Sequence, residues 1–543
     1  MQGLIGTRIS RTGGALLVAL GCLSAALLLR GGEAAQGASS KPNVVMFTTD
    51  DQTLRDMIAM PRTTNLIGGQ GTNFQRAFVS FPLCCPSRVS VQTGQYAHNH
   101  HVLGNTPPAG GYQTFNDTND LPVWLQTAGY RTIHIGKMPN GFGTDPNAVP
   151  PGWGPFLGDA NPLSKGEFYA FLGPGSTYFA FQLDENGTVK QYDGDEYQTD
   201  TYADIAVDRI DNHVANFPNT PLYMQVQFFA PHDPNQPATR HAGALSTVLL
   251  PVDKSFNEKD LRDKPAWVKR INRLGGGLIS KIATRYRGRL ETLLAVDEAI
   301  ERIVAELEAD GQLGNTYLIF TSDNGFMQGQ HRLHQGKFVP YEPSIQVPLL
   351  IRGPGIPAGG ISKELVSNVD ITSTILEMTG AAAGLTQDGR SLLPFARDPR
   401  LKTTRPILLE TGPPGAIGEI ASASSKGRRA KVSKYVKNLD LDRSAQIARV
   451  ITAPRYRAIR TGRYLLVKYG DGGRELYDLL KDRLEVNSFY KDARYKPVRK
   501  FLLKALAKLS PCVGASCNLE IGKPPKPLPK PKPKVKKKKK AAA

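Results

Sequence analysis

The stretch Cys84-Cys85-Pro86-Ser87-Arg88 places two thiols, a hydroxyl and a permanent cation within five residues. Pro86 is suited to the first turn of a helix, because it lacks the backbone N–H that would have no partner there. Thr93-Gly94 then marks the end of a short helix. Cys84 would lie just before the helix N-terminus, where free N–H groups and the helix dipole favour an anion. On its own, the stretch predicts either a low-pKa thiolate or two core cysteines packed under a helix cap.

Two adjacent carboxylates, Asp50 and Asp51, follow an apolar run that begins at Asn43. A nearly continuous apolar run of this length is typical of a buried strand. Open α/β sheets bind ligands outside the carboxyl ends of their strands, so acids in this position could hold a ligand. A solvated turn or a helix cap would explain the pair better if it stood alone.

Further candidate strands also end in polar groups, which favours a site at one edge of a sheet. Tyr130–Ile135 leads to Lys137, Leu222–Ala230 leads to His232, and Tyr317–Thr321 leads to Asp323 and Asn324. Between them lies a clear helical pattern over Ile282–Leu313. Strands that alternate with helices predict an α/β fold, with a sheet flanked by helices.

The chain after residue 400 has a different pattern. Tyr456–Tyr469 and Arg474–Leu479 are typical of strands, and Gly470-Asp471-Gly472-Gly473 joins them as a hairpin turn. A helix is expected over Pro497–Leu509. We therefore predict a smaller C-terminal α+β subdomain with an antiparallel sheet. The expected organisation is a signal peptide over residues 1–36, a catalytic domain over 41–400, this subdomain over 401–520 and a tail over 521–543, with residues 425–450 as a basic surface excursion.

The N-terminus predicts export. Arg8 and Arg11 precede the apolar run Gly13–Leu29, which is followed by small residues, as in a cleaved signal peptide; an uncleaved anchor is the alternative. The protein would then be secreted, periplasmic or at the cell surface. Cys512 and Cys517 fit a local disulfide in an oxidising compartment.

The C-terminus is a lysine- and proline-rich tail. Residues 523–543 hold ten lysines and no acid, which is half of the formal net charge of +20. The rest of the chain is only mildly basic, so the charge does not predict nucleic-acid binding. The tail is either a solubilising segment or a tether to an acidic polymer or membrane surface.

Four of these landmarks, in this order, resemble the sulfatase family. They are the C-x-P-S-R signature at Cys84–Arg88 with its trailing Thr93-Gly94, the pair Asp50-Asp51, the stretch Ser322–Gly325, and the C-terminal phrase Glu475–Leu479. The resemblance runs from about residue 41 to about residue 510. It implies an alkaline-phosphatase-like fold with a large mixed sheet.

The resemblance implies that a maturation enzyme, the formylglycine-generating enzyme, oxidises Cys84 to formylglycine (3-oxoalanine). The hydrated aldehyde is a geminal diol: one oxygen attacks the sulfur of a sulfate ester, and the second expels the sulfate as the aldehyde reforms. Cys85 occupies the variable position of the motif. The family's metal ligands correspond to Asp50, Asp51, Asp323, Asn324 and the modified residue 84. Oxygen ligands of this kind favour Ca²⁺, or Mg²⁺, over zinc.

The resemblance also implies a set of cations around the ester. Arg88 would hold the diol and the metal site, while Lys137, His232 and Lys337 would contact the sulfate. One departure concerns the family's G-K-x-H pattern, because Gly136-Lys137-Met138-Pro139-Asn140 lacks the histidine. Asn140 could take its place, and His98 and His100 could line the pocket near the leaving alcohol. These features resemble the glucosamine-6-sulfatase and heparan endosulfatase branch.

The expected function is hydrolysis of an O-sulfate ester on a sugar such as glucosamine 6-sulfate, a glycosaminoglycan component. One alternative is a phosphoesterase or phosphodiesterase on the same metal scaffold, which would not need formylglycine. Another is a secreted polyanion-binding protein with an inactive site, which would act through the tail.

Overall fold

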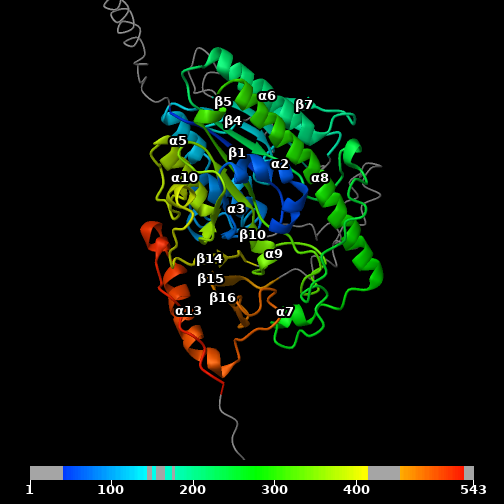
Figure 1. Cartoon of the computed structure of the whole chain (residues 1–543), viewed down its shortest axis with the longest axis vertical. Coiled ribbons are helices and arrows are strands. Elements are labelled where there is room, and N and C mark those ends of the chain that lie inside the picture. The colour runs from blue at the N-terminus through cyan, green and yellow to red at the C-terminus, as the bar shows by residue number, and fades with distance from the viewer. Residues whose placement is uncertain (1–40, 144–148, 155–165, 174–177, 414–452, 531–543) are drawn as a thin grey trace, which may run out of the picture. The chain divides into compact units, whose positions relative to one another are not determined.

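The computed structural model of the chain describes residues 41–143, 149–154, 166–173, 178–413 and 453–530 (Figure 1). From Pro42 onward the described residues belong to one compact unit. Three expectations lie outside the described residues: the signal peptide, the surface excursion over 425–450, and the tail beyond residue 530. The domain boundaries remain predictions.

The first apolar run forms strand β1 (Asn43–Thr49), and all of its residues are buried. It lies between β8 (Leu222–Gln227) and β9 (Thr316–Ser322) and runs parallel to both. β4 (Arg131–Gly136) is parallel to β8 on its other side. The carboxyl ends of these strands therefore meet at one edge of the sheet, as the sequence predicts.

The sheet has ten strands, in the order β12-β2-β11-β9-β1-β8-β4-β5-β6-β7. It is mixed, because β11 (Leu349–Arg352) runs antiparallel to β9. Its other strands are β2 (Thr72–Phe74), β5 (Gly166–Phe171), β6 (Gln182–Glu185), β7 (Thr188–Gln191) and β12 (Gly360–Ser362). A three-stranded sheet contains β10 (Gln346–Val347), β3 (Ala77–Phe78) and β13 (Val366–Ser367).

Both faces of the large sheet are covered by helices. Successive side chains of β1 point to opposite faces. Val45 and Phe47 pack into a core with α6 (Gln198–Asn216) and α8 (Gly276–Ala309). Val44 and Met46 pack into a second core with α5 (Leu121–Thr127) and α10 (Val369–Thr379). Burial on both faces explains why β1 is apolar throughout rather than alternating.

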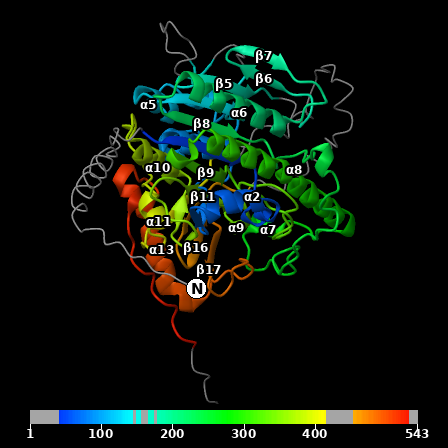
Figure 2. The ribbon, with the colours of Figure 1, turned by 45° about the horizontal axis from the view of Figure 1, so that its top comes forward.

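The C-terminal part forms an antiparallel sheet with the order β14-β15-β16-β17, as predicted. Its strands are β14 (Ile407–Glu410), β15 (Tyr456–Arg460), β16 (Tyr464–Tyr469) and β17 (Arg474–Asp478). α13 (Lys496–Leu509) packs on this sheet through an apolar core, and Figures 1 and 2 show the helix beside it. The predicted single segment Tyr456–Tyr469 is two strands, because a turn at residues 461–463 reverses the chain.

Two further observations concern a disulfide and the apolarity of the helices. Cys512 and Cys517 form the predicted disulfide. Among the described residues, no helix combines the length and the apolarity that crossing a membrane requires.

Candidate active site

The structure brings the predicted residues together at the carboxyl edge of the large sheet. Asp50 and Asp51 follow β1, and Asp323 and Asn324 follow β9. The other contributors come from a strand end, a helix and two loops: Lys137 after β4, His232 after β8, Cys84 and Arg88 on α3 (Cys84–Thr93), and Lys337 before α9 (Glu342–Ile345).

Helix α3 begins one residue earlier than the sequence predicts. Cys84 is its first residue, and Leu83 is the extended residue that precedes it. Pro86 still lies in the first turn, where its missing N–H breaks no helical hydrogen bond. The helix ends where predicted, with Gly94 in the left-handed conformation at φ 69°. This geometry places Cys84 next to the ends of the strands. Arg88 follows about one turn later on the same helix.

Cys84 is buried, and its Sγ lies 2.7 Å from Nζ of Lys337 and 3.7 Å from Oδ1 of Asp50. Burial and the Asp50 carboxylate raise the pKa of Cys84 to about 11, more than Lys137 and Lys337 lower it. With the chain's own groups alone, the thiol is therefore protonated at neutral pH. The surrounding groups of the chain therefore raise this pKa rather than lower it, as a low-pKa thiolate would require.

Cys85 has different surroundings. Its Sγ accepts a hydrogen bond from the backbone N–H of Asn140 at 2.9 Å, and burial raises the pKa of its thiol to about 12. Cys85 packs with Val89 and Val102. Cys85 is therefore a core cysteine, as one of the two readings of the paired thiols expects.

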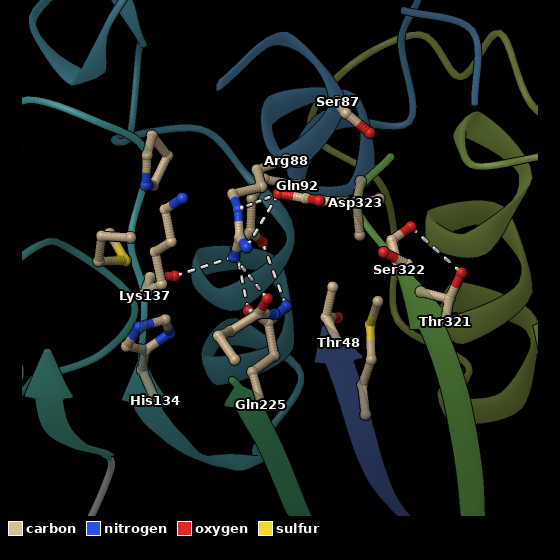
Figure 3. Close-up of a pocket in the computed structure, with 15 residues that line it drawn as sticks. Thr48, Ser87, Arg88, Gln92, His134, Lys137, Gln225, Thr321, Ser322 and Asp323 are labelled. Carbon is tan, nitrogen blue, oxygen red and sulfur yellow. Dashed lines mark hydrogen bonds and ion pairs between the residues drawn. The ribbon is translucent and has the colours of Figure 1, made fainter. Parts of the chain in front are cut away.

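Arg88 connects the carboxyl ends of four strands, β1, β4, β8 and β9, and Figure 3 shows it between Lys137 and Asp323. Its Nε and Nη2 each lie 3.0 Å from Oδ2 of Asp323, and Nη2 lies 3.4 Å from Oδ2 of Asp50. Its Nη1 donates to the backbone oxygen of Lys137 at 3.1 Å and to Oε1 of Gln227 at 2.9 Å. Burial would lower the pKa of Arg88, but the two carboxylates outweigh it and raise the pKa, so the cation is permanent.

A small cavity lies against Arg88 on the inner side of the site, with Gln92, His134 and Gln225 in its lining (Figure 3). Its volume is about 20 Å³. A space of this size holds about one water molecule, so it cannot accept a sugar. The cavity is part of the polar support behind Arg88 and is not the substrate pocket.

The carboxylates and Asn324 form a donor set that fits a hard divalent cation. Oxygens of Asp50 and Asp323 lie with the Cys84 sulfur in one group within 4.8 Å, and Asp50, Asp51 and His232 form a second such group. Oδ1 of Asn324 is buried without a hydrogen-bond partner among the described residues, while its Nδ2 donates to Asp51 at 2.6 Å. An unpaired buried carbonyl oxygen beside carboxylates is suited to coordination of Ca²⁺ or Mg²⁺.

The same carboxylates face the buried cations of Arg88 and Lys137 and the partly buried cation of Lys337. Lys137 contacts Asp50, and Lys337 contacts Asp51. Burial would raise the pKa of Asp50, but Lys137, His232 and Arg88 outweigh it and hold that pKa well below its ordinary value. Burial and the charge of Asp50 raise the pKa of Asp323. The site therefore contains closely spaced carboxylates and cations, and the cations can contact a bound anion.

His232 lies on the more open side of this cluster, with 29% of its side chain exposed. Nδ1 lies 2.8 Å from the backbone oxygen of Asp233, which only accepts, so Nδ1 carries a proton. Nε2 points to the site and lies 3.8 Å from Oδ2 of Asp51. It is therefore placed to contact an anionic group bound above the carboxylates.

Asn140 and the two other predicted histidines lie differently. Oδ1 of Asn140 is buried without a partner among the described residues, so this side chain keeps a free acceptor. His98 instead binds Glu410 through Nδ1 at 3.0 Å and the backbone oxygen of Cys512 through Nε2 at 2.8 Å. His100 contacts Ser90 and the N–H of Val102, and burial lowers its pKa to about 3. The expectation that His98 and His100 line the pocket is corrected: their ring nitrogens are used within the fold.

The His98–Glu410 contact predicts a pH dependence of stability. Burial would lower the pKa of His98, but the hydrogen bonds to Glu410 and Cys512 outweigh it and raise this pKa above 6.5. The contact therefore stabilises fully below the unfolded-state pKa, and this contribution is lost as pH rises through the folded-state value. Urea unfolding at pH 6, 7 and 8 should show the free energy falling more in the wild type than in His98→Gln. Equal slopes in the two proteins would contradict this role.

Two supporting residues were not predicted from the sequence. Gln227 holds Arg88, and Arg289 of α8 donates to the backbone oxygens of Asp51 at 2.6 Å and Pro231 at 3.2 Å. Arg289 thus fixes both the Asp51 turn and the turn before His232. A signal existed in both cases: Gln225 and Gln227 alternate with apolar residues in β8, and Arg289 lies on the buried face of its helix beside Leu290.

Carboxylates ringed by cations at the carboxyl edge of a mixed α/β sheet are suited to metal-assisted hydrolysis of anionic esters. A family model described as Sulfatase matches residues 42–381. The chain belongs to the sulfatase family.

Several relatives carry sulfatase names. Human N-acetylglucosamine-6-sulfatase is 36% identical over 70% of this chain and 68% of its own length. An arylsulfatase of Volvox carteri is 32% identical over 92% of this chain and 79% of its own length. A Caenorhabditis elegans homologue of extracellular sulfatase Sulf-1 is 36% identical, and the chain spans about half (49%) of that relative.

Solved structures share the fold. One, determined with its substrate D-glucosamine-2-N,6-O-disulfate, has a TM-score of 0.65 at 24% identity and covers 87% of this chain and 97% of its own. The phosphonate monoester hydrolase of Agrobacterium radiobacter has a TM-score of 0.58 at 21% identity, covering 86% and 95%. These likenesses show the large mixed sheet with helices that the sequence predicts; they do not separate sulfate from phosphonate chemistry.

Proposed function

We propose that this chain hydrolyses O-sulfate esters on sugars, with 6-sulfated glucosamine as the substrate class. The observation that carries the proposal is the position of Cys84, whose Sγ lies beside Lys337 and Asp50 where the strand ends converge. Membership of the sulfatase family and the names of the relatives support the reaction and the sugar. The names are those of other proteins, so the substrate needs a direct test.

We infer that Cys84 is the precursor of formylglycine. The thiol is protonated and buried, which makes it a poor nucleophile as it stands. An aldehyde at this position supplies a hydrated nucleophile that can release a bound sulfate without a second attacking water. Because Cys84 is buried in the folded chain, a maturation enzyme would reach it before folding is complete.

The residues that would hold the metal are Asp50, Asp51, Asp323 and Asn324. Their oxygens favour Ca²⁺, with Mg²⁺ as the alternative. A bound divalent ion supplies positive charge next to residue 84 and to the ester oxygens. Arg88 holds two of the carboxylates in place, since it contacts both Asp50 and Asp323.

Three cationic or polar groups would receive the sulfate. Lys137 pairs with Asp50 and the partly buried Lys337 pairs with Asp51, and His232 presents Nε2 from the more open side. Charges held in place before the substrate arrives stabilise the charge that spreads over the ester oxygens during cleavage. Asn140, whose buried Oδ1 has no partner among the described residues, is the proposed replacement for the histidine of the G-K-x-H pattern.

A substrate panel tests the proposal against its rival, a phosphoesterase on the same scaffold. The purified, matured protein should release sulfate from N-acetylglucosamine 6-sulfate and from an aryl sulfate. We expect kcat/KM for an aryl phosphate to be lower by about a hundredfold or more. Preferred cleavage of phosphate esters, or full activity with an unmodified Cys84, would overturn the proposal in favour of the rival. Release of no sulfate from any ester would favour a polyanion-binding protein with an inactive site.

The proposal also includes export of the chain and a binding role for its C-terminal tail. The segment before residue 41 would direct the chain out of the cytoplasm. One relative is named a homologue of an extracellular sulfatase. The lysines beyond residue 530 would add electrostatic attraction to acidic polymers.

A further inference from the structure

The exposed face of α13 is a row of lysines. Lys496, Lys500, Lys504 and Lys508 recur at every fourth position, and all four are exposed. Positions four apart are neighbours on a helix surface, so the row extends over about 18 Å at 1.5 Å per residue. The only other exposed residue of the helix is Ala507. The helix contains no acid, so no charge within it balances the row.

The chain that follows α13 returns along it and brings more lysines to the same place. Leu519 and Ile521 pack against the core that holds the C-terminal half of α13. Further on, the N–H of Leu528 donates to the backbone oxygen of Arg494 at 2.8 Å, just before the helix begins. The segment therefore runs antiparallel to α13, and both views show it beside the helix (Figures 1 and 2). Lys523, Lys526 and Lys530 on this segment are exposed.

These seven lysines have no salt bridge to any described residue. Of the acids close to them in the sequence, Asp492 pairs with Arg494, and Glu520 accepts a hydrogen bond from Thr404 and is the one negative charge on the returning segment. A line of uncompensated positive charge, partly held on a rigid helix, is suited to a linear polyanion. The lysines also lie outside residues 42–381, which match the family model, and none of them is among the proposed catalytic residues.

We propose that the lysine surface, meaning Lys496, Lys500, Lys504 and Lys508 with Lys523, Lys526 and Lys530, is a second binding site for a linear sulfated polysaccharide. The choice of a sulfated polymer rests on the proposed function, because such a polymer carries the ester that the catalytic site would cleave. Binding at this surface would raise the local concentration of sulfate esters near the catalytic site.

The surface is less suited to a membrane. The large apolar side chains of α13, such as Leu502 and Leu506, point into the core below the helix. A helix that lies in a membrane interface presents an apolar face to the lipid, and here that face is already covered by the protein. On the returning segment Leu528 is 53% exposed, but a single leucine gives little membrane affinity.

The test uses the full-length matured protein and heparin as the sulfated polymer. The variant K496E/K500E/K504E/K508E should bind heparin about tenfold more weakly or worse at 0.15 M NaCl. The slope of log Kd against log salt should fall by about 3. A milder variant with four Lys→Gln changes should lie between this variant and the wild type. Activity on a small sulfate ester should stay within about twofold of the wild type, since the catalytic residues are untouched.

The matched control is K254E/K259E/K281E/K363E, which changes four other exposed lysines by the same charge. It should weaken heparin binding by less than about threefold. Equal losses in both variants would show that only net charge matters and would overturn the site. Retained heparin binding with lost binding to phosphatidylserine vesicles would assign the surface to membranes instead. If the wild type cleaves no small sulfate ester, and only K496E/K500E/K504E/K508E loses heparin binding, the proposed function fails while this site stands.

Discussion

Replacing Cys84 by alanine should lower kcat/KM for a sulfate ester by about 10⁴-fold or more, with little change in folding. The side chain at position 84 lies between Lys337 and Asp50, where a nucleophile can meet an ester that is held by the surrounding cations. Without it, Lys137, Lys337 and His232 can still bind sulfate, but the site has no group that attacks sulfur. Initial rates on an aryl sulfate and thermal unfolding measured on the same samples check this result.

Cys85→Ala is the matched control, because it removes the neighbouring thiol of the same helix. Cys85 packs in a small core and accepts from Asn140, so we expect a stability loss of about 1 kcal/mol. Once that loss is allowed for, the activity should remain within about threefold of the wild type. A Cys85→Ala enzyme that is as inactive as Cys84→Ala would show that the helix, rather than the residue at position 84, was damaged.

Replacing Asp50 by asparagine should remove the metal. Asp50 contacts Arg88 and Lys137 and shares one group of candidate ligand atoms with Cys84 and Asp323. Among the described residues, Asp50 is the carboxylate that Lys137 contacts. Its loss leaves the buried ammonium group of Lys137 without an ion-pair partner, which lowers the free energy of unfolding by about 3 kcal/mol. We expect the metal content to fall from about one ion per chain to near zero. Activity should fall by about a thousandfold.

The control for this loss of stability is Asp297→Asn. Asp297 is also buried and accepts three hydrogen bonds, from the N–H of Arg62 and from the N–H and hydroxyl of Thr63. Asp297 is a buried residue of α8, and it belongs to no group of candidate metal ligands among the described residues. This variant should lose stability while keeping its metal, measured by elemental analysis after dialysis. If Asp50→Asn retains a full equivalent of metal, the assignment of the metal ligands is wrong.

Much of the site could be predicted because each of its residues follows a recognisable local pattern. Asp50 and Asp323 each follow a buried apolar run, Lys137 follows the buried strand β4, and parallel strands bring such ends to one edge. The left-handed Gly94 ends α3 where Thr93-Gly94 predicts it. The helix expected over Ile282–Leu313 is α8, which instead covers Gly276–Ala309, with Gly275 as its N-cap and the left-handed Gly311 two residues beyond its end.

The supporting contacts could not be predicted, because they join residues far apart in the chain. Arg88 and Gln227 are 139 positions apart, and Arg289 and Asp51 are 238 apart. The residues next to Arg88 and Arg289 in the sequence do not indicate which distant residue each of them contacts. The misplacement of His98 has the same cause: its partners Glu410 and Cys512 come from the C-terminal part, so a His-rich loop near the motif resembled a pocket wall.

The central claim is that residue 84 works as formylglycine, and mass spectrometry of the peptide that contains it tests this claim most directly. The protein should be produced together with a formylglycine-generating enzyme, digested and analysed beside its activity. We predict that active preparations contain a lighter peptide, in which the CH₂–SH of Cys84 has become an aldehyde, and that activity rises in proportion to its fraction. Cys85 should remain an unmodified thiol. Full activity in a preparation whose peptide carries an intact Cys84 thiol would contradict the account.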